Sequence, residues 1–328
     1  MIKRRGARSG SRAPLHKSFY RHVLWAGGRL LLSLADGAPL PLSSWFFSRL
    51  FLLWYYVIRR HRRLAEKQLV ERLGVDEEEA RSVVRRMFVN LGRNFAEFVT
   101  LGGATRRDVE RMVDGSTFLQ AVDAHRRGRG VVVVTGHIGN WELLGAYSAL
   151  HYPTTVIARR IYFPRYQEEV AALRRRCGIR VVYQDEGIRP ALEALRRNHV
   201  LGILADQDLR GVSGVYTRFF GREAFTPVAP SALAQVTGAP LIVAALFRTG
   251  RLSHRIEVEG PFPPPKAETK EHTRLLLTQE WTSALERLVR RRPEQWAWFH
   301  PRWRTRPEKI DAPRISDLRS AREPSSAN

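Results

Sequence analysis

The stretch from Gly130 to Glu142 reads Gly-Val-Val-Val-Val-Thr-Gly-His-Ile-Gly-Asn-Trp-Glu. Its part Val131–Thr135 is a continuous β-branched run, which is typical of a strand buried on both faces of a parallel sheet. The glycines Gly136 and Gly139 follow at once and permit a tight turn. The stretch therefore predicts a buried strand, a turn that carries a histidine, and the start of a helix.

Short apolar runs around this stretch alternate with helical patterns. We expect further strands at Thr154–Ala158, Ile179–Val182, Val200–Leu204, Leu241–Phe247 and Ser253–Val258. We expect helices at Asp76–Leu101, Arg165–Cys177, Ile188–Arg197, Val228–Thr237 and Lys270–Arg291. Such alternation predicts an α/β fold with a mostly parallel central sheet flanked by helices.

The composition restricts the function classes. The 328 residues include 55 Lys and Arg against 32 Asp and Glu, a net charge of +23. This excess predicts an anionic partner, such as anionic membrane lipids. Nucleic acid is not expected, because the chain has no zinc-finger, RNP-like or basic-zipper pattern. The single cysteine, Cys177, excludes an internal disulfide and a multi-cysteine zinc site.

The positive charge is concentrated near the N-terminus, where the most apolar runs also occur. Residues 1–65 hold 13 Lys and Arg and one acid. Within them, seven aromatic residues precede a basic cluster: Trp45, Phe46, Phe47, Phe51, Trp54, Tyr55 and Tyr56, then Arg59, Arg60, Arg62 and Arg63. This pattern predicts a segment that lies in or dips into a membrane, with its basic flank on anionic lipid at the cytoplasmic side. The alternative is an amphipathic helix that caps a soluble core.

The histidine of the first stretch is the main catalytic candidate. His137 follows the buried strand, and Glu142 comes five residues later, in the first turn of the predicted helix. Because the chain folds back at this corner, we expect the carboxylate to reach the imidazole. A carboxylate on one ring nitrogen makes the other more basic, so the pair could take a proton from a substrate hydroxyl. The alternative is a structural pair; a metal site is not expected, since no third ligand stands at a typical spacing.

Polar residues also follow two other predicted strands. Arg159 ends one strand, and Asp206, Gln207 and Asp208 follow another. Because ligands of open α/β sheets bind at the carboxyl ends of the strands, we expect one cleft there, with Asp206 organising it rather than transferring a proton.

Taken together, these residues resemble the late acyltransferases of lipid A biosynthesis, the lauroyl and myristoyl transferases. Phosphatidylinositol mannoside acyltransferases look similar. The resemblance covers about Arg59 to Arg306. Its ordered motifs are His137 with Glu142; Arg159; Asp206, Gln207 and Asp208; Phe219, Phe220 and Gly221 with Thr226; and Glu294, Gln295, Trp296 and Trp298 through Pro307. Departures occur at Phe163, where the family often has Asn, and over Leu209–Tyr216; they leave the acceptor and the acyl chain length open.

The resemblance implies a fold like that of the glycerolipid acyltransferases and an O-acyl transfer. His137 and Glu142 would deprotonate a hydroxyl of a lipid A precursor, which would attack an acyl thioester on acyl carrier protein, or on coenzyme A. Candidate donors to the oxyanion formed in this transfer are Arg159 and the backbone of the turn that contains Gly136, Gly139 and Asn140. We expect no cofactor and a location on the cytoplasmic face of the inner membrane. The alternatives are an acyltransferase for another glycolipid or lysophospholipid, such as the phosphatidylinositol mannoside type with an acyl-CoA donor, and a non-catalytic membrane lipid-binding protein.

Four segments follow from these patterns. Residues 1–20 form a basic N-terminal arm, and residues 21–62 a membrane-associated helical segment. Residues 63–307 form the acyltransferase domain. Residues 308–328 are polar, with Pro, Ser and Arg, and are expected to be a disordered tail.

Overall fold

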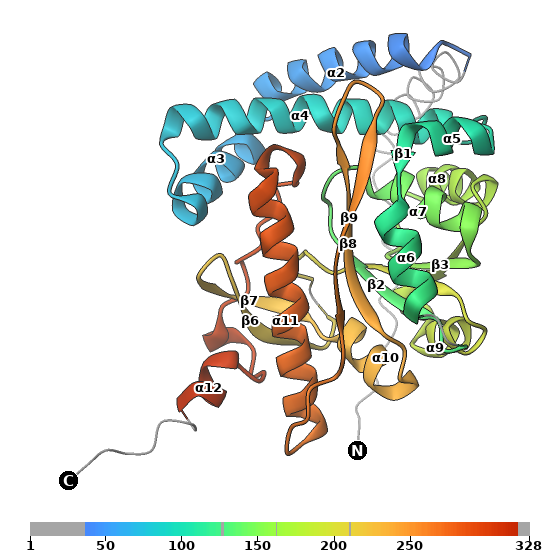
Figure 1. Ribbon diagram of the computed structural model, residues 1–328. Helices are drawn as coiled ribbons and strands as arrows, with labels where there is room; N and C mark the ends of the chain where they lie inside the picture. Colours follow the sequence, from blue (N-terminus) through green and yellow to red (C-terminus); the bar gives the residue numbers. More distant parts are fainter. Residues whose placement is uncertain (1–36, 126–127, 162, 210, 321–328) are drawn as a thin grey trace.

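The computed structural model describes residues 37–125, 128–161, 163–209 and 211–320, so the expected arm over residues 1–20 lies outside it. Its centre is a seven-stranded sheet in the order β1–β9–β8–β2–β5–β3–β4 (Figure 1). The strands are β1 (Val113–Asp114), β2 (Val131–Thr135), β3 (Thr154–Ala158), β4 (Ile179–Tyr183), β5 (Val200–Leu204), β8 (Leu241–Arg248) and β9 (His254–Phe262). All neighbouring pairs are parallel except β8 with β9. The predicted α/β fold with a mostly parallel sheet is confirmed.

Helices cover both faces of this sheet, as the doubly buried run of β2 predicts. Because successive strand residues face opposite sides, Val132 and Val134 belong to one core and Val131 and Val133 to the other. The first core is completed by α9 (Arg189–Arg196), α10 (Ala229–Thr237) and α11 (Lys270–Arg291). The second is completed by α5 (Arg106–Met112), α6 (Ser116–His125) and α7 (Trp141–His151).

Two N-terminal helices cross one end of the sheet. In Figure 1, α4 (Glu77–Thr100) runs across the top with α2 (Leu40–Val57) alongside it, and α3 (Arg59–Leu73) joins the two. The start of α4 is fixed by Asp76, whose Oδ1 accepts a hydrogen bond of 2.8 Å from the backbone of Glu79. These helices occupy the end of the sheet at which β2 leads into α7.

The predicted membrane segment coincides in part with α2. Its inner side is buried through Phe47 and Tyr55, whereas Trp45, Leu53 and Trp54 are exposed. Among the residues that the structure describes, no helix combines the length and apolar character needed to cross a bilayer. The described part of the segment thus includes a helix, α2, that is apolar on both its buried and its exposed side.

Two features were not expected from the sequence. A hairpin of β6 (Gly214–Phe219) and β7 (Arg222–Pro227) was not predicted. In the segment expected to be a disordered tail, the structure places a short helix, α12 (Ile315–Ser320). The segment just before α12 is attached to the hairpin, because the backbone N–H of Tyr216 donates a hydrogen bond of 2.9 Å to the carbonyl of Pro313.

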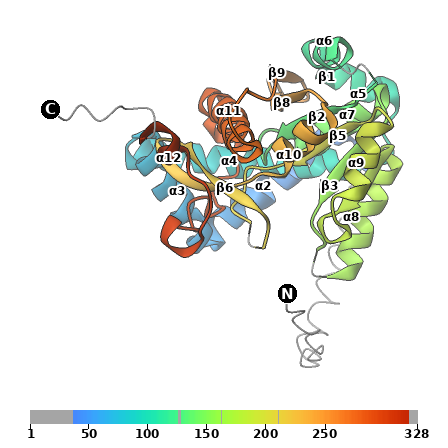
Figure 2. The same ribbon diagram turned by 90° about the horizontal axis from the view of Figure 1, so that it is seen from below.

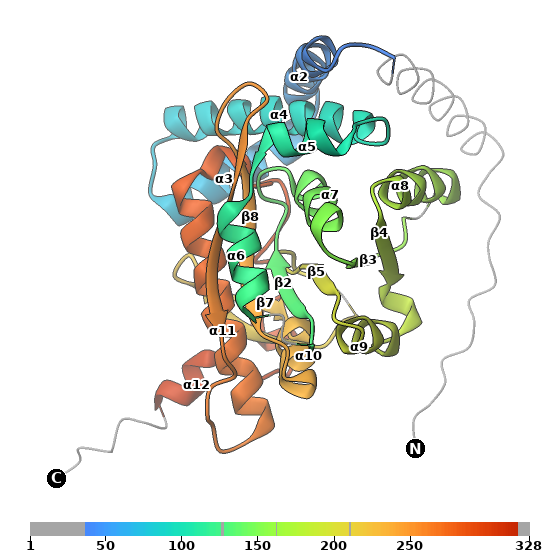
Figure 3. The same cartoon turned by 45° about the vertical axis from the view of Figure 1, so that its right-hand side comes forward.

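The ends of the sheet carry different helices. Figure 2 shows α11 and α12 on one side and α9 with α8 (Pro164–Arg176) on the other. Figure 3 shows α8 beside β4, the edge strand. Four further short elements are η1 (Gln184–Glu186), η2 (Pro293–Gln295), η3 (Pro307–Lys309) and the turn at residues 249–253 between β8 and β9. The site described next lies at the carboxyl ends of β2, β3 and β5.

Candidate active site

The turn after β2 has no room for side chains at its two glycines. A Cβ atom on Gly136 would lie 2.8 Å from Cγ of Asp206. Gly139 has φ +56°, and a Cβ atom there would lie 1.8 Å from the carbonyl oxygen of Leu246. Both distances are below any ordinary contact, so only glycine lets the turn sit this close to the neighbouring strands. The turn thereby holds His137 against Asp206.

Asp206 is the carboxylate that binds the His137 ring. Its Oδ1 lies 2.9 Å from Nδ1 of His137, and its Oδ2 accepts hydrogen bonds from the backbone N–H of His137 at 2.8 Å and from Nε1 of Trp296 at 2.9 Å. Asp206 is 2% exposed. Burial raises the pKa of this carboxyl, but the charge and hydrogen bonds of His137 outweigh burial and lower the pKa to about 2. Asp206 is therefore ionised at neutral pH.

An ionised Asp206 fixes the tautomer of His137. Because the carboxylate only accepts, Nδ1 of the ring carries the proton and Nε2 is left with its lone pair. Nε2 has one long contact, 3.5 Å, with Nε2 of Gln207. The side chain is 28% exposed, and its ring meets the Trp141 ring edge-on at 5.0 Å. The basic nitrogen is thus accessible.

The surroundings of His137 also increase its basicity. Burial lowers the pKa of the ring, but the charge and hydrogen bond of Asp206, with a further contribution from the charge of Glu142, raise the pKa above its usual value of 6.5. A raised pKa makes the neutral ring a stronger proton acceptor, which is the property that a general base requires. The arrangement can withdraw a proton from a hydroxyl group in the cavity.

The expected contact between Glu142 and the His137 ring is not observed. Glu142 stands in the first turn of α7, and Arg174 of α8 holds its carboxylate through bonds of 2.6 and 3.1 Å. The bidentate guanidinium occupies the oxygens of Glu142, while Asp206 occupies Nδ1 of the ring. Glu142 therefore acts on His137 through its charge, and Asp206 takes the hydrogen-bonding position that we expected of Glu142.

One cavity of about 270 Å³ brings together several of the predicted residues. Its polar lining includes His137, Glu142, Arg159, Gln207 and Arg174. Its apolar lining comes from α7, β3, α8 and the segments around β5: Trp141, Val156, Ile157, Ala158, Ile161, Val170, Ile179, Leu204 and Leu209. A polar end with an apolar wall is typical of a site for a ligand with a reactive head and a hydrocarbon chain.

Most of the predicted backbone oxyanion donors in the turn are already bonded within the protein. The N–H of Gly139 donates to the carbonyl of Gln295 at 2.7 Å, and that of Asn140 donates to the carbonyl of Leu246 at 2.9 Å. The side chain of Asn140 is buried and caps α7. The side chains of Arg159 and Gln207 line the cavity, so they are better placed than these two amides to bind an oxyanion there.

Asp208 lies outside this cavity. Its carboxylate accepts hydrogen bonds from Thr305, at 2.6 Å to the backbone N–H and 2.7 Å to the hydroxyl, and from Arg304 at 3.3 Å. Its own backbone N–H donates to Nε2 of His300 at 3.1 Å. Asp208 thus fastens the C-terminal segment to the end of β5, while Asp206, two residues earlier, holds His137.

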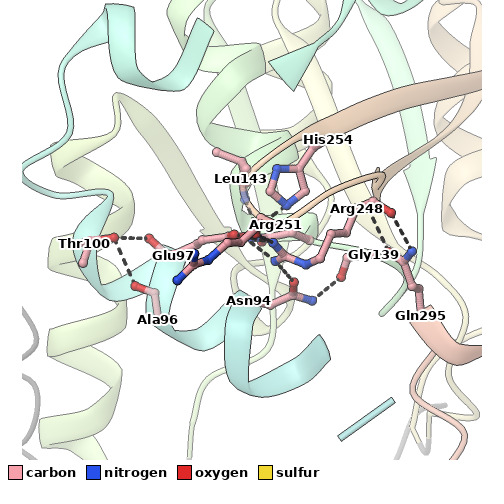
Figure 4. Close-up of polar contacts among 11 residues, drawn as sticks. Asn94, Ala96, Glu97, Thr100, Gly139, Leu143, Arg248, Arg251, His254 and Gln295 are labelled. Carbon is pink, nitrogen blue, oxygen red and sulfur yellow. Dashed lines mark hydrogen bonds and ion pairs between the residues drawn. The ribbon is translucent and has the colours of Figure 1, made fainter. Parts of the chain in front are cut away.

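A buried ionic cluster behind the turn was missed from the sequence. Glu97 of α4, 1% exposed, receives both ends of the Arg248 guanidinium at 2.6 and 2.7 Å and lies 3.2 Å from Nε2 of His254 (Figure 4). Burial raises the pKa of Glu97, but contacts with His254 and Arg248 outweigh it and lower the pKa to about 2. The cluster is therefore a charged pair in the interior, which is stable only while both partners are present.

This cluster holds the turn that carries His137. Glu97 accepts a hydrogen bond of 2.7 Å from the side chain of Asn140, and Asn94 donates to the carbonyl of Gly139 at 2.7 Å. Asn94 is itself held by Arg248 at 2.9 Å. The sequence signal for this role was an acid within the apolar face of the helix at Asp76–Leu101. The network links α4 and β8 to the turn that aims His137.

Replacing Glu97 with glutamine should destabilise the fold and reduce turnover. Removing one partner of a buried pair costs about 3–5 kcal/mol, because Arg248 keeps its charge without a counter-charge. Urea unfolding measures the loss, and Glu97→Gln combined with Arg248→Met should recover part of it. A free energy of unfolding within about 1 kcal/mol of the wild type for Glu97→Gln alone would contradict the assigned role.

A larger apolar groove of about 690 Å³ borders the cavity. It lies between α2, α4 and α8 and is lined by Phe47, Leu50, Phe51, Leu53, Trp54, Val57, Phe95, Phe98, Val99, Tyr166, Glu169, Val170 and Leu173. Val170 lines both spaces. The aromatic residues of the predicted membrane segment thus form one wall of a groove that leads toward the site. Within the described residues, no three His, Cys, Asp or Glu side chains are grouped so as to hold a metal ion.

An α/β sheet with a carboxylate-bound histidine at a strand end, beside an apolar groove, defines a class of proteins suited to acid–base chemistry on lipids. The profile of the bacterial lipid A biosynthesis acyltransferase family matches residues 13–305. The chain belongs to this family. The resemblance stated from the motifs is confirmed.

The individual relatives share between 25% and 28% of their residues with this chain over the matched stretches. The chain is 28% identical over 202 residues to a phosphatidylinositol mannoside acyltransferase of Mycobacterium tuberculosis, which covers 60% of this chain and 61% of the relative. The corresponding protein of Mycolicibacterium smegmatis is 28% identical over 197 residues, 58% of this chain and 62% of the relative. The lipid A biosynthesis palmitoleoyltransferase of Escherichia coli is 25% identical over 190 residues, 56% of this chain and 59% of the relative. The chain thus spans about three fifths of the length of these relatives.

Proposed function

We propose that this protein is an O-acyltransferase that moves a fatty acyl chain from a thioester, carried by acyl carrier protein, to a hydroxyl of a lipid A precursor. The observation that carries the proposal is the accessible Nε2 of His137, which bears the lone pair of the neutral ring because the Nδ1 proton is bonded to Asp206. Family membership supports the reaction type.

The reaction needs no nucleophile from the protein. Nε2 of His137 takes the proton of the acceptor hydroxyl as its oxygen attacks the thioester carbonyl carbon. The C–O bond forms, the C–S bond breaks, and the leaving thiolate takes the proton back from His137. Arg159 and Gln207 line the cavity where the carbonyl oxygen becomes negative, and donors at this place stabilise the transition state.

The apolar groove supports a lipid substrate. Its lining is almost entirely hydrocarbon and aromatic, with Glu169 as its one charged residue. Burying a hydrocarbon chain there contributes about 0.8 kcal/mol for each CH₂ group. We assign this groove to a fatty chain of the substrates, with the reacting carbonyl or hydroxyl at His137.

The purified full chain tests the proposal when it is incubated with acyl carrier thioester and a lipid A precursor. Mass spectrometry of the lipid should show one added acyl chain, with release of free carrier thiol. No transfer to any lipid hydroxyl from carrier or coenzyme A thioesters, with lipid binding intact, would identify a non-catalytic lipid-binding protein instead.

A second acceptor class is favoured by the relatives of higher identity. The two mycobacterial relatives at 28% identity are named for phosphatidylinositol mannoside, against 25% for the relative named for lipid A. The same assay with a phosphatidylinositol mannoside acceptor and an acyl-CoA donor separates the two. The acceptor with the higher kcat/KM identifies the substrate class.

We further propose that α2 holds the protein on the cytoplasmic face of the inner membrane. Its exposed face carries Trp45, Phe46, Leu50, Leu53 and Trp54, and exposed aromatic and aliphatic residues of this kind favour the membrane interface.

Replacing Trp45, Leu53 and Trp54 together with serine should release the protein from membranes. Each large side chain withdrawn from the interface weakens partitioning by roughly 1.5–3 kcal/mol at full burial, so the combined loss exceeds tenfold. Vesicle sedimentation measures it, with Val236→Ser, an exposed apolar residue on α10, as the control. Unchanged sedimentation of the triple variant would exclude α2 as the anchor.

A further inference from the structure

A second groove, of about 680 Å³, lies on the other flank of α2 and is strongly basic. It is formed by α4, by the turn between β8 and β9, and by the segment after α11. Its charged lining consists of Arg85, Arg86, Arg93, Arg248, Arg292 and Glu294. Five arginines against one acid leave a concentrated positive charge in a hollow that the proposed reaction does not use.

The positive charge of this groove is largely unneutralised. Arg248 is paired with Glu97. Within the described part of the chain, Arg85, Arg93 and Arg292 form no ion pair. By contrast, the arginines on α11 that face β9, Arg287 and Arg291, are paired with glutamates.

Two details show that the positive charge of the groove is only partly compensated within the protein. The pKa of Arg93 is lowered, first by burial and then by the charge of Arg248, with smaller contributions from Arg251 and Arg49; the charge of Glu97 raises this pKa but does not outweigh them. Nε of the buried Arg248 has no hydrogen-bond partner within the described residues. Like charges this close repel one another, so an anion bound among them would relieve an unfavourable interaction.

The position of the groove indicates where the anion comes from. Leu52 of α2 lines the basic groove, whereas Leu53 and Trp54, the next residues along the helix, line the apolar groove on the opposite flank. The exposed apolar face of α2 therefore lies between a hydrocarbon groove and a cationic groove. At a membrane surface, the phosphate groups lie at the level just outside the hydrocarbon, where cations next to an interfacial helix meet them.

We propose that the basic groove binds the phosphate-bearing headgroup of an anionic membrane lipid, at a docking site separate from the catalytic cavity. Arg85, Arg93 and Arg292 supply the cations, since none of them forms an ion pair within the residues that the structure describes. Arg248 supplies structure, because Glu97 already holds it. The inference rests on the proposed membrane location of α2, and it adds a lipid-selective contact to the apolar one.

The test compares two variants of equal charge. In one, Arg85, Arg93 and Arg292 are replaced with glutamine; in the other, Arg107, Arg180 and Arg196, which are exposed and outside the groove, are replaced with glutamine. Vesicles of phosphatidylcholine, with and without phosphatidylglycerol, are sedimented with each protein at one ionic strength. Because each basic residue near an anionic surface contributes about 1 kcal/mol, the groove variant should lose about tenfold or more of its affinity for the phosphatidylglycerol vesicles. The control should lose less than about threefold, because that attraction falls off within a Debye length.

Three outcomes would overturn the inference. Equal losses in the two variants would mean that net charge alone attracts the protein, and no loss in either would mean that the groove is idle. Displacement of the wild type from vesicles by inorganic phosphate, with chloride reduced to keep the ionic strength constant, would make the site one for free phosphate.

Transfer with detergent-dispersed substrates separates this inference from the proposed function. The groove variant should keep its wild-type rate there, because none of its replaced side chains lines the cavity around His137. A groove variant that binds vesicles normally but has lost transfer in detergent would place these arginines in substrate binding and contradict the docking role.

Discussion

His137→Ala should lower acyl transfer by about 10²- to 10⁴-fold, the range that a positioned general base contributes. The ring is the group whose Nε2 can take the hydroxyl proton. Asp206 behind it cannot take its place, since it is buried and its Oδ2 is engaged by the backbone N–H of residue 137 and by Trp296. The measurement is kcat/KM with a carrier thioester and a lipid acceptor.

Two further variants keep this result interpretable. His137→Asn retains an N–H that can donate to Asp206, so the buried carboxylate keeps a partner while the base is lost. His151→Ala removes a histidine at the end of α7, the helix that follows the turn of His137, and this residue lies outside the cavity. His137→Asn should be as inactive as the alanine variant and His151→Ala close to wild type. Near-normal transfer by either His137 variant would remove this residue from the catalytic role.

Asp206→Asn should be the second most damaging change, with a loss on the order of 10³-fold. An amide cannot stabilise the imidazolium that forms during transfer, and its NH₂ group can hold the ring in the wrong tautomer. Glu142→Gln should cost about tenfold or less, because Glu142 acts on the ring through its charge across the cavity.

Comparison of the two carboxylate variants decides between the contact in the structure and the contact expected from the motif. The kcat/KM of both variants should be measured at a temperature at which both remain folded, because Asp206→Asn changes a buried site and could destabilise the protein. A Glu142→Gln loss equal to or larger than that of Asp206→Asn would restore Glu142 as the partner of His137.

The centre of the fold could be predicted from the sequence because its signals are local and strong. The valine run Val131–Val134 has no polar face, which requires cover on both sides of the strand. The hairpin Gly214–Phe219 with Arg222–Pro227 was missed, since its stability comes from long-range contacts such as that of Tyr216 with Pro313. β9 runs antiparallel to β8 because only a short turn connects them. The pattern of apolar residues predicts a strand at this place but does not give its direction.

The candidate site was predictable in its members but not in its pairings. His137 and Asp206 are 69 residues apart, and they meet because β2 and β5 are neighbours in parallel register, with Thr135 opposite Leu204. Strand order of this kind depends on the whole sheet, whereas the spacing of His137 and Glu142 is visible in one motif. Glu97 was missed for the same reason, because its partners come from β8, β9 and the turn.

The acid limb of the pH profile of kcat/KM tests the central claim, that His137 is the base and Asp206 maintains its basicity. The base must be unprotonated, and Asp206 raises the pKa of His137, so transfer by the wild type should fall as the pH drops through a value above 6.5. In Asp206→Asn the main raising influence is gone, and the limb should move to lower pH, while in Glu142→Gln it should move less. A limb that stays in place in Asp206→Asn would contradict the account.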